Sequence, residues 1–287
     1  MKVERTYKPK FENVSLDEWL ESPKRRIKKI PVNISKKRDS LLRFSSLYID
    51  FSRWLTWEVQ TPEIESESAM GLRYASKMYA AFLKLAEHPE QDLTFKIFDL
   101  SEVTWNGKGM LEAGRAHPEQ WLDAYFLAMV TRDSESMDSL ASFPVEVMKQ
   151  SATKSGPVSY KLVEVFQAYH HRQENYPSLL NEGMKMAVEQ GNDWALGIAM
   201  GYLETFAALS TDIGFDFNET LAKNVQLQEK YWMNASEPDT VPVESFLPIQ
   251  LLGMACMWHD MGNEVTVESD SLPRFLINGT YFKKLEI

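Results

Sequence analysis

The sequence predicts an all-α fold in which antiparallel helical hairpins stack in one compact domain, with at most one or two short strands. Apolar residues recur at three- and four-residue steps along most of the chain, which is the spacing of a buried helix face. A capping residue or a proline precedes most of these segments. The predicted helix starts lie roughly 20 to 40 residues apart, as in stacked hairpins, without any repeat consensus. We expect residues 35–287 to form this domain and residues 1–34 to form a basic N-terminal arm.

The first third of the chain is predicted to hold a short helical turn and two long helices. Ser15 and Glu18 have the spacing of a capping box. A long helix is then expected from Asn33 or Ser35, and a second one after the capping residue Thr61, with proline at its first position. The residues predicted to face inward are Leu41, Phe44, Tyr48, Phe51 and Leu55 in the first long helix, and Met70, Tyr74, Met78, Phe82 and Leu85 in the second.

One strand, an irregular connection and a further series of helices are predicted next. The run Leu93–Leu100 is the best strand candidate outside the C-terminus, and three glycines between residues 107 and 114 indicate an irregular connection. Helices are then expected to open at His117, Ser134, Pro157, Pro177, Asp193 and Phe217, followed by a polar loop over residues 234–242 and a last helix from Val243 to Met261.

The run from Phe246 to Leu276 combines several local signals. An apolar helix is expected to end at Gly262, because a left-handed C-cap residue costs glycine no Cβ clash. Val265 and Val267 then alternate with polar residues, which predicts a strand before the turn at Pro273.

Composition and charge place limits on function. The chain has 44% apolar and 25% charged residues, which is typical of a globular protein, and no apolar run approaches the roughly 18 residues of a membrane span. The first residues lack the apolar core of a secretory signal, and Cys256 is the single cysteine, so we expect a reducing, cytoplasmic setting.

The net charge of -10 is unevenly distributed. Residues 1–45 hold 13 Lys/Arg and 6 Asp/Glu, whereas residues 46–287 hold 18 Lys/Arg and 35 Asp/Glu. An acidic body should repel nucleic acid and anionic membranes and attract basic partners, although acidity can also serve solubility alone. The basic block around Lys24 could contact nucleic acid, but it lacks interleaved aromatic residues, so we expect a solvated arm or an arm docked on the acidic body.

The sequence contains no motif that assigns catalysis, a metal or a cofactor. The five histidines form no HExxH pattern, and the phosphate-binding glycine motifs are absent. His259 and Asp260 resemble the dyad of metal phosphohydrolases, but such a site needs further ligands, so a helix-end role is expected for His259. Cys256 lies in an apolar run, where a thiol behaves as a small hydrophobic group. These observations favour a binding protein over an enzyme.

The stretch from Pro248 to Ile277 resembles the end of the immunity protein 49 family of bacterial polymorphic toxin systems. Residues 217–232, and more weakly residues 121–144, are also similar to this family, so the resemblance covers about residues 120 to 280. It implies an all-α protein that neutralises a toxin encoded beside it, and the matching residues have an architectural character. They are Leu251, Leu252, Ala255, Cys256, Gly262, Val265, Val267, Glu268, Ser269, Leu272, Pro273 and Leu276.

The expected partner is a cognate toxin domain, and the acidic body suggests a basic one such as a nuclease, which carboxylates would occlude in place of phosphates. A helical-repeat adaptor without a toxin partner is the alternative. An extended superhelix with an open groove would favour the adaptor, and a compact body would favour the inhibitor. We expect toxin contacts from acids in loops and helix starts. The candidates are Glu63, Glu65, Glu67, Asp133, Glu135, Asp138, Asp212, Asp216, Glu237 and Asp239.

Overall fold

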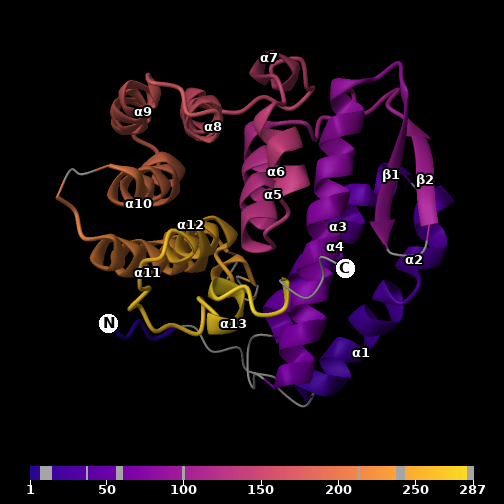
Figure 1. Cartoon of the computed structure of the whole chain (residues 1–287), viewed down its shortest axis with the longest axis horizontal. Helices are drawn as coiled ribbons and strands as arrows, with labels where there is room; N and C mark the ends of the chain where they lie inside the picture. Colours follow the sequence, from indigo (N-terminus) through magenta and orange to yellow (C-terminus); the bar gives the residue numbers. More distant parts are fainter. Residues whose placement is uncertain are drawn as a thin grey trace.

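Helices that follow one another along the chain pack as antiparallel hairpins around one main core (Figure 1). The computed structural model describes residues 1–6, 15–36, 38–55, 61–98, 101–211, 214–236 and 243–282. Its main hydrophobic cluster includes residues from Val3 to Phe282, so the hairpins share a core and do not extend into an open superhelix. This arrangement confirms the predicted all-α class.

The N-terminal layer contains four helices of very different length. The predicted capping box is confirmed, because the Glu18 amide donates to Ser15 Oγ at 3.3 Å and the Ser15 amide donates to Glu18 Oε2 at 2.9 Å. The helix after it runs well beyond the expected turn. The first long helix begins later than expected, at Leu41, because two 3₁₀ turns occupy Ile34–Lys36 and Arg38–Ser40. The helices are α1 (Leu16–Ile27), α2 (Ile30–Asn33), α3 (Leu41–Leu55) and α4 (Pro62–Glu87).

The α3–α4 hairpin is the closest pair in this layer. Gly71 of α4 lies against α3, where an added Cβ would stand 3.1 Å from Ser52 Oγ and 3.2 Å from Tyr48 Cδ1. Thr61 caps α4 as predicted, with its side chain accepting from the Ile64 amide. Met70 is 40% exposed, so its predicted inward position is wrong. The buried face of α4 passes instead through Gly71 and its neighbours on the α3 side.

The predicted strand pairs with a second strand that the sequence did not indicate. β1 (Asp92–Phe98) and β2 (Ser101–Asn106) form an antiparallel hairpin in which Leu93 opposes Trp105. The predicted end of the strand, at residues 99 and 100, lies outside the described residues. Gly107 follows β2 and touches the end of α4, because a Cβ there would stand 2.2 Å from the Leu85 carbonyl oxygen.

α5 is the central helix of the molecule and contacts α4, α6, α8 and α12. Gly253 of α12 allows its closest approach, since an added Cβ would lie 2.9 Å from Phe126 Cδ1. The predicted cap at Asp193 is wrong, because Asn192 Oδ1 accepts from the Ala195 amide instead, just before a π-helical turn at Ala195–Ala199. The remaining helices are α5 (Pro118–Val130), α6 (Ser134–Ala141), α7 (Val145–Met148), α8 (Pro157–His170), α9 (Tyr176–Gln190), α10 (Met200–Ser210), α11 (Phe217–Ala235), α12 (Ile249–Asp260) and α13 (Arg274–Ile277).

The C-terminal segment differs from its prediction in two places. The last long helix is broken into a 3₁₀ turn (Val243–Ser245) and α12, because Pro248 has a non-helical ψ of 87° and its ring nitrogen has no hydrogen to donate. Val265 and Val267 are buried, but they form no strand among the described residues. The two-residue period therefore reflects alternating burial along an extended loop.

The N-terminus lies beside this loop. The Val3 amide donates to the Glu268 carbonyl at 2.8 Å, and the Glu268 amide donates to the Met1 carbonyl at 2.7 Å. The described part of the basic arm is thus docked on the body, with Leu20 of α1 buried against α3 residues. The boundary expected at residue 34 stays a prediction. The helices that the structure describes include none with the length and hydropathy of a membrane span.

Candidate functional site

The described contact acids lie in three places, at the start of α4, at α6 and at the start of α11. Asp212, Glu237 and Asp239 lie outside the described residues. The expectation that Asp133 is exposed is wrong, because its side chain is only 1% exposed. It caps α6, accepting from the Ser136 amide at 3.3 Å, and it forms an ion pair with Lys77 Nζ of α4 at 3.1 Å. Asp133 therefore joins α4 to α6.

Two further acids lie on α6. Glu135 is exposed and shares Lys77 with Asp133, since its Oε2 is 2.9 Å from Lys77 Nζ. Asp138 is also exposed, and its Oδ1 lies 3.0 Å from His170 Nε2 of α8. The structure therefore brings Asp133, Glu135 and Asp138 together on one short helix. Of the three, Glu135 and Asp138 remain accessible to a partner.

The other described candidates stand at helix starts. Glu63, Glu65 and Glu67 lie in the first two turns of α4, where carboxylates interact favourably with the helix dipole. Glu65 Oε2 accepts from the Tyr281 hydroxyl at 2.7 Å, whereas Glu63 and Glu67 are exposed. Asp216 caps α11 by accepting from the Glu219 amide at 2.8 Å.

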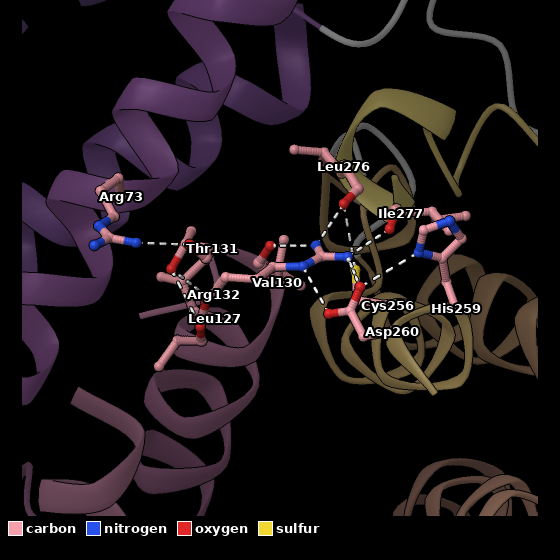
Figure 2. A network of polar contacts seen from close by, with 11 residues as sticks. Arg73, Leu127, Val130, Thr131, Arg132, Cys256, His259, Asp260, Leu276 and Ile277 are labelled. Carbon is pink, nitrogen blue, oxygen red and sulfur yellow. Dashed lines mark hydrogen bonds and ion pairs between the residues drawn. The ribbon is translucent and has the colours of Figure 1, made fainter. Parts of the chain in front are cut away.

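Arg132 forms a polar network at the end of α5 (Figure 2). Its guanidinium donates to both carboxylate oxygens of Asp260, at 3.0 and 3.1 Å. It also donates to the Val130 carbonyl at 2.8 Å and to the Leu276 carbonyl at 2.6 Å. The side chain thereby connects α5 with the end of α12 and with α13. A bidentate arginine–carboxylate pair is geometrically specific, so this network fixes the C-terminal segment on the central helix.

The same network accounts for the residues that first suggested chemistry. Asp260 is held by Arg132, and His259 Nδ1 is 3.3 Å from the same carboxylate, so the pair closes a helix end. Cys256 is fully buried, and burial raises the pKa of its thiol to about 11. Among the residues that the structure describes, no three His, Cys, Asp or Glu side chains gather as metal ligands.

A hollow of about 750 Å³ lies beside this network, and we call it the aromatic cavity. Its lining includes the buried residues Tyr125, Phe166 and Phe206, together with methionines and the half-buried Arg132. The Phe166 ring meets Phe126 and Phe206 edge-on, with centroids 4.8 and 4.9 Å apart. Tyr125, Met129, Phe166 and Phe206 are the buried core residues of this lining, and the rest of it is half-buried or exposed. We therefore interpret the cavity as a surface hollow above packed aromatic residues.

A second hollow, of about 380 Å³, lies between α3, α4 and α5 on one side and α10, α11 and α12 on the other. We call it the polar pocket. Its volume is within the roughly 300–1,000 Å³ of ligand sites. Its four acids come from three different elements. Arg53 pairs with one of them, Asp50, at 3.0 Å, so the other three give the pocket a surplus of negative charge. The acids are Asp50 of α3, Glu119 and Asp123 of α5, and Glu244 of the 3₁₀ turn at Val243–Ser245.

The two α5 acids of the polar pocket have opposite pKa shifts. Burial raises the pKa of Asp123 to about 6, and the effect is only partly offset by Arg53 and by a 2.7 Å hydrogen bond from Gln250 Nε2. For Glu119, burial also acts upward, but hydrogen bonds from His117, Ser155 and Ser159 bring its pKa to about 2. Glu119 is therefore a satisfied carboxylate, whereas Asp123 is a carboxylate that lacks sufficient stabilising partners at neutral pH.

Gln228 Oε1 and Trp232 Nε1 are buried polar atoms of this pocket that have no partner among the described residues. Gln228 is 4% exposed, and its Oε1 accepts no hydrogen bond from the described residues, although its Nε2 lies 3.4 Å from the Tyr202 hydroxyl. Trp232 Nε1 is a buried donor that likewise has no acceptor within the described ranges. Buried polar groups are normally hydrogen-bonded, so one unmet acceptor and one unmet donor in a single pocket indicate a place for a ligand.

The polar pocket was not predicted from the sequence. Its lining residues run from Ser46 to Gln250 and come from separate helices, so no local motif contains them. Asp123 reads in sequence as a solvated helix residue between apolar neighbours. The available signal was a charged residue within the strongly apolar segment of α5, where nearly every other position is buried.

The family model described as immunity protein 49 matches residues 60–276. The match includes α4, the polar pocket's α5, α11 and α12, and the Arg132 network. No significant match exists among the curated proteins or among the solved structures.

Proposed function

The chain belongs to the immunity protein 49 family, and we propose that it neutralises a basic, nuclease-type toxin domain by covering its active site. Membership of the family implies a protein that binds a cognate toxin and neutralises it without catalysis. The nature of the toxin and the mode of inhibition are our proposal.

The observation that carries the nuclease proposal is the charge of the body. Residues 46–287 have 35 Asp/Glu against 18 Lys/Arg. Nucleases bind phosphates through basic surfaces, and a strongly acidic partner is attracted to such a surface at long range. Association of this kind is fast at low salt and slows as salt screens the charges.

Exposed acids would provide the outer contacts of this interface. Glu63 and Glu67 of α4, Glu135 and Asp138 of α6, and Asp216 at the start of α11 are exposed. We propose them as rim contacts, each of which contributes little alone. Glu65 is partly engaged by Tyr281, and Asp133 is occupied inside the fold. Asp212, Glu237 and Asp239 stay proposed contacts without a structural description.

We further propose that inhibition takes place in the cytoplasm. A nuclease acts on nucleic acid there, and the single, buried, free cysteine is compatible with a reducing compartment. The alternative of a helical-repeat adaptor receives no support from a concave superhelical groove, because the helical pairs share one main core.

The test is co-expression with the product of the neighbouring gene. We expect the neighbour's C-terminal domain alone to stop growth and to degrade cellular DNA or RNA, and we expect this chain to restore growth. A catalytically inactive toxin variant should co-purify with the chain. The nuclease proposal fails if the toxin leaves nucleic acid intact, and the immunity function fails if toxicity persists with the folded chain present.

A further inference from the structure

We propose that the polar pocket receives a basic side chain, arginine or lysine, from a protruding segment of the toxin. The inference rests on the proposed function and names the anchor of that interface. It would put the centre of binding at the junction of α3, α5, α11 and α12 and leave the exposed acids as a rim. A centre of buried anchors with a rim of weak contacts is the usual anatomy of such interfaces.

The negative charge of the pocket favours a positively charged occupant. Glu119, Asp123 and Glu244 line the pocket as negative charges beyond the Asp50–Arg53 pair. Among the described residues, Asp123 Oδ1 accepts a hydrogen bond from Gln250 Nε2, and a carboxylate can accept several more. A guanidinium or ammonium group supplies both the missing positive charge and the missing donors.

The aromatic rings of the pocket also favour a positively charged occupant. Trp194, Tyr202 and Trp232 line the pocket together with Tyr79. Cations are attracted to the faces of such rings, and the attraction strengthens when water is excluded. Burial raises the pKa of Tyr79 to about 12, so its hydroxyl stays neutral and remains a hydrogen-bonding group.

The unmet atoms indicate a residue of a polypeptide in preference to a free cation. Gln228 Oε1 needs a donor and Trp232 Nε1 needs an acceptor. An inserted arginine or lysine brings donors at the tip of its side chain and a carbonyl acceptor on its own backbone. A simple cation would satisfy Gln228 and leave the indole N–H without a partner.

The test measures affinity between this chain and a catalytically inactive toxin domain. Asp123→Asn keeps the shape of the side chain and removes its charge, and we expect at least tenfold weaker binding. Gln228→Leu removes the acceptor and leaves every charge in place, and we expect a loss of several-fold. Glu90→Gln removes an exposed acid in the turn before β1 and should bind as the parent does. Thermal unfolding of each variant checks that it is folded.

Arginine and lysine substitutions in the toxin identify the inserted residue. We expect one of them to weaken binding strongly to the parent chain and only slightly to Asp123→Asn, which is the signature of direct coupling. If Asp123→Asn and Gln228→Leu both bind as tightly as the parent, the pocket proposal is wrong while the immunity function stands. If the parent itself does not bind the toxin, the proposed function is what fails.

A titration with a small molecule distinguishes a free cation from an inserted toxin side chain as the occupant of the pocket. Agmatine, which carries a guanidinium on a short chain, is titrated into the parent and into Asp123→Asn. We expect at most weak binding, because the indole N–H stays unsatisfied. Tight agmatine binding that depends on Asp123, combined with a toxin complex indifferent to Asp123→Asn, would overturn the proposal and make the pocket a small-molecule site.

Discussion

Arg132 and Arg172 have the same left-handed backbone conformation, each with a φ of 53°, at equivalent places after α5 and α8. In both, the next residue donates its amide back into the helix, from Asp133 to Ala128 at 2.9 Å and from Gln173 to Ala168 at 2.8 Å. This conformation costs a residue with a Cβ about 1 kcal/mol. The Arg132 side chain offsets that cost with its network, while the exposed Arg172 guanidinium has no hydrogen bond to any described residue.

The two arginines form a matched pair for mutation. Arg132→Ala should lower the free energy of unfolding by about 3 kcal/mol, because it removes the bidentate partner of Asp260 and the donor to the Val130, Leu276 and Ile277 carbonyls. Arg172→Ala removes the same side chain from the same backbone conformation and should change the free energy of unfolding by less than about 0.5 kcal/mol. Urea unfolding of both variants measures the difference. Equal effects would mean that the network contributes no stability.

Asp133→Ala should affect stability and leave toxin affinity unchanged. The change removes the α6 cap and one partner of Lys77, which together cost about 1–3 kcal/mol. Glu135→Ala, which removes the exposed partner of the same lysine, should cost less than about 0.5 kcal/mol. Urea unfolding and toxin affinity are measured for both. A large loss of affinity in folded Asp133→Ala would contradict its internal role.

Asp123→Asn should stabilise the free protein at neutral pH. The pKa of Asp123 is raised to about 6 in the folded state from an ordinary value of 3.8, so the folded state binds a proton more tightly than the unfolded state. The contribution of this group to stability is therefore greatest below about pH 4 and falls as pH rises through 6. At pH 7 the charged form costs on the order of 3 kcal/mol, which the asparagine variant avoids.

The measurement is urea unfolding of the parent and of Asp123→Asn between pH 4 and pH 8. The difference in the free energy of unfolding should grow across the interval from pH 4 to pH 6 and then level off. A difference that does not vary with pH would contradict the raised pKa. A carboxylate retained at a cost to stability is typical of a binding site, where affinity for a partner is gained in return.

Cys256 should resist alkylation while the protein is folded. Its thiol is buried, its pKa is raised to about 11, and only the thiolate reacts. Iodoacetamide at pH 8 should label it slowly in buffer and rapidly in unfolding concentrations of urea, as followed by mass spectrometry. Fast labelling of native protein would mean that α12 opens readily. Arg132→Ala should accelerate the reaction, because Arg132 binds the segment that covers the thiol.

The Ser15, Thr61 and Gly262 caps were the features best predicted from the sequence, because caps act locally. The Ser15–Glu18 box and the Thr61 cap occur as expected, and Gly262 has a φ of 89°. Features that depend on distant partners were missed. β2 was missed because its partner β1 provides the pairing, and Val265 was taken for a strand residue because alternating burial has the same period as a strand.

The polar pocket is another feature that local sequence patterns could not predict, because distant residues form it. Asp123, Gln228 and Gln250 are single polar residues on three helices, and each alone suggests a solvent-facing position. Their common role depends on the packing of α5 against α12 and of α11 against α12, which no local pattern encodes. The acids that could be chosen from sequence were those at helix starts, and two of these, Asp133 and Asp216, serve as caps.

The pairing of Lys2 with Glu268, closed by the Val3 amide, has a consequence for biosynthesis. These residues are separated by almost the whole chain, so the pairing can form only after the ribosome has made residue 268. At about 5–20 residues per second, this delay is on the order of tens of seconds. During that time the first residues cannot pair with Glu268, while the helical hairpins can already fold from local contacts. Closing the bridge is therefore among the last steps in the maturation of each newly made molecule.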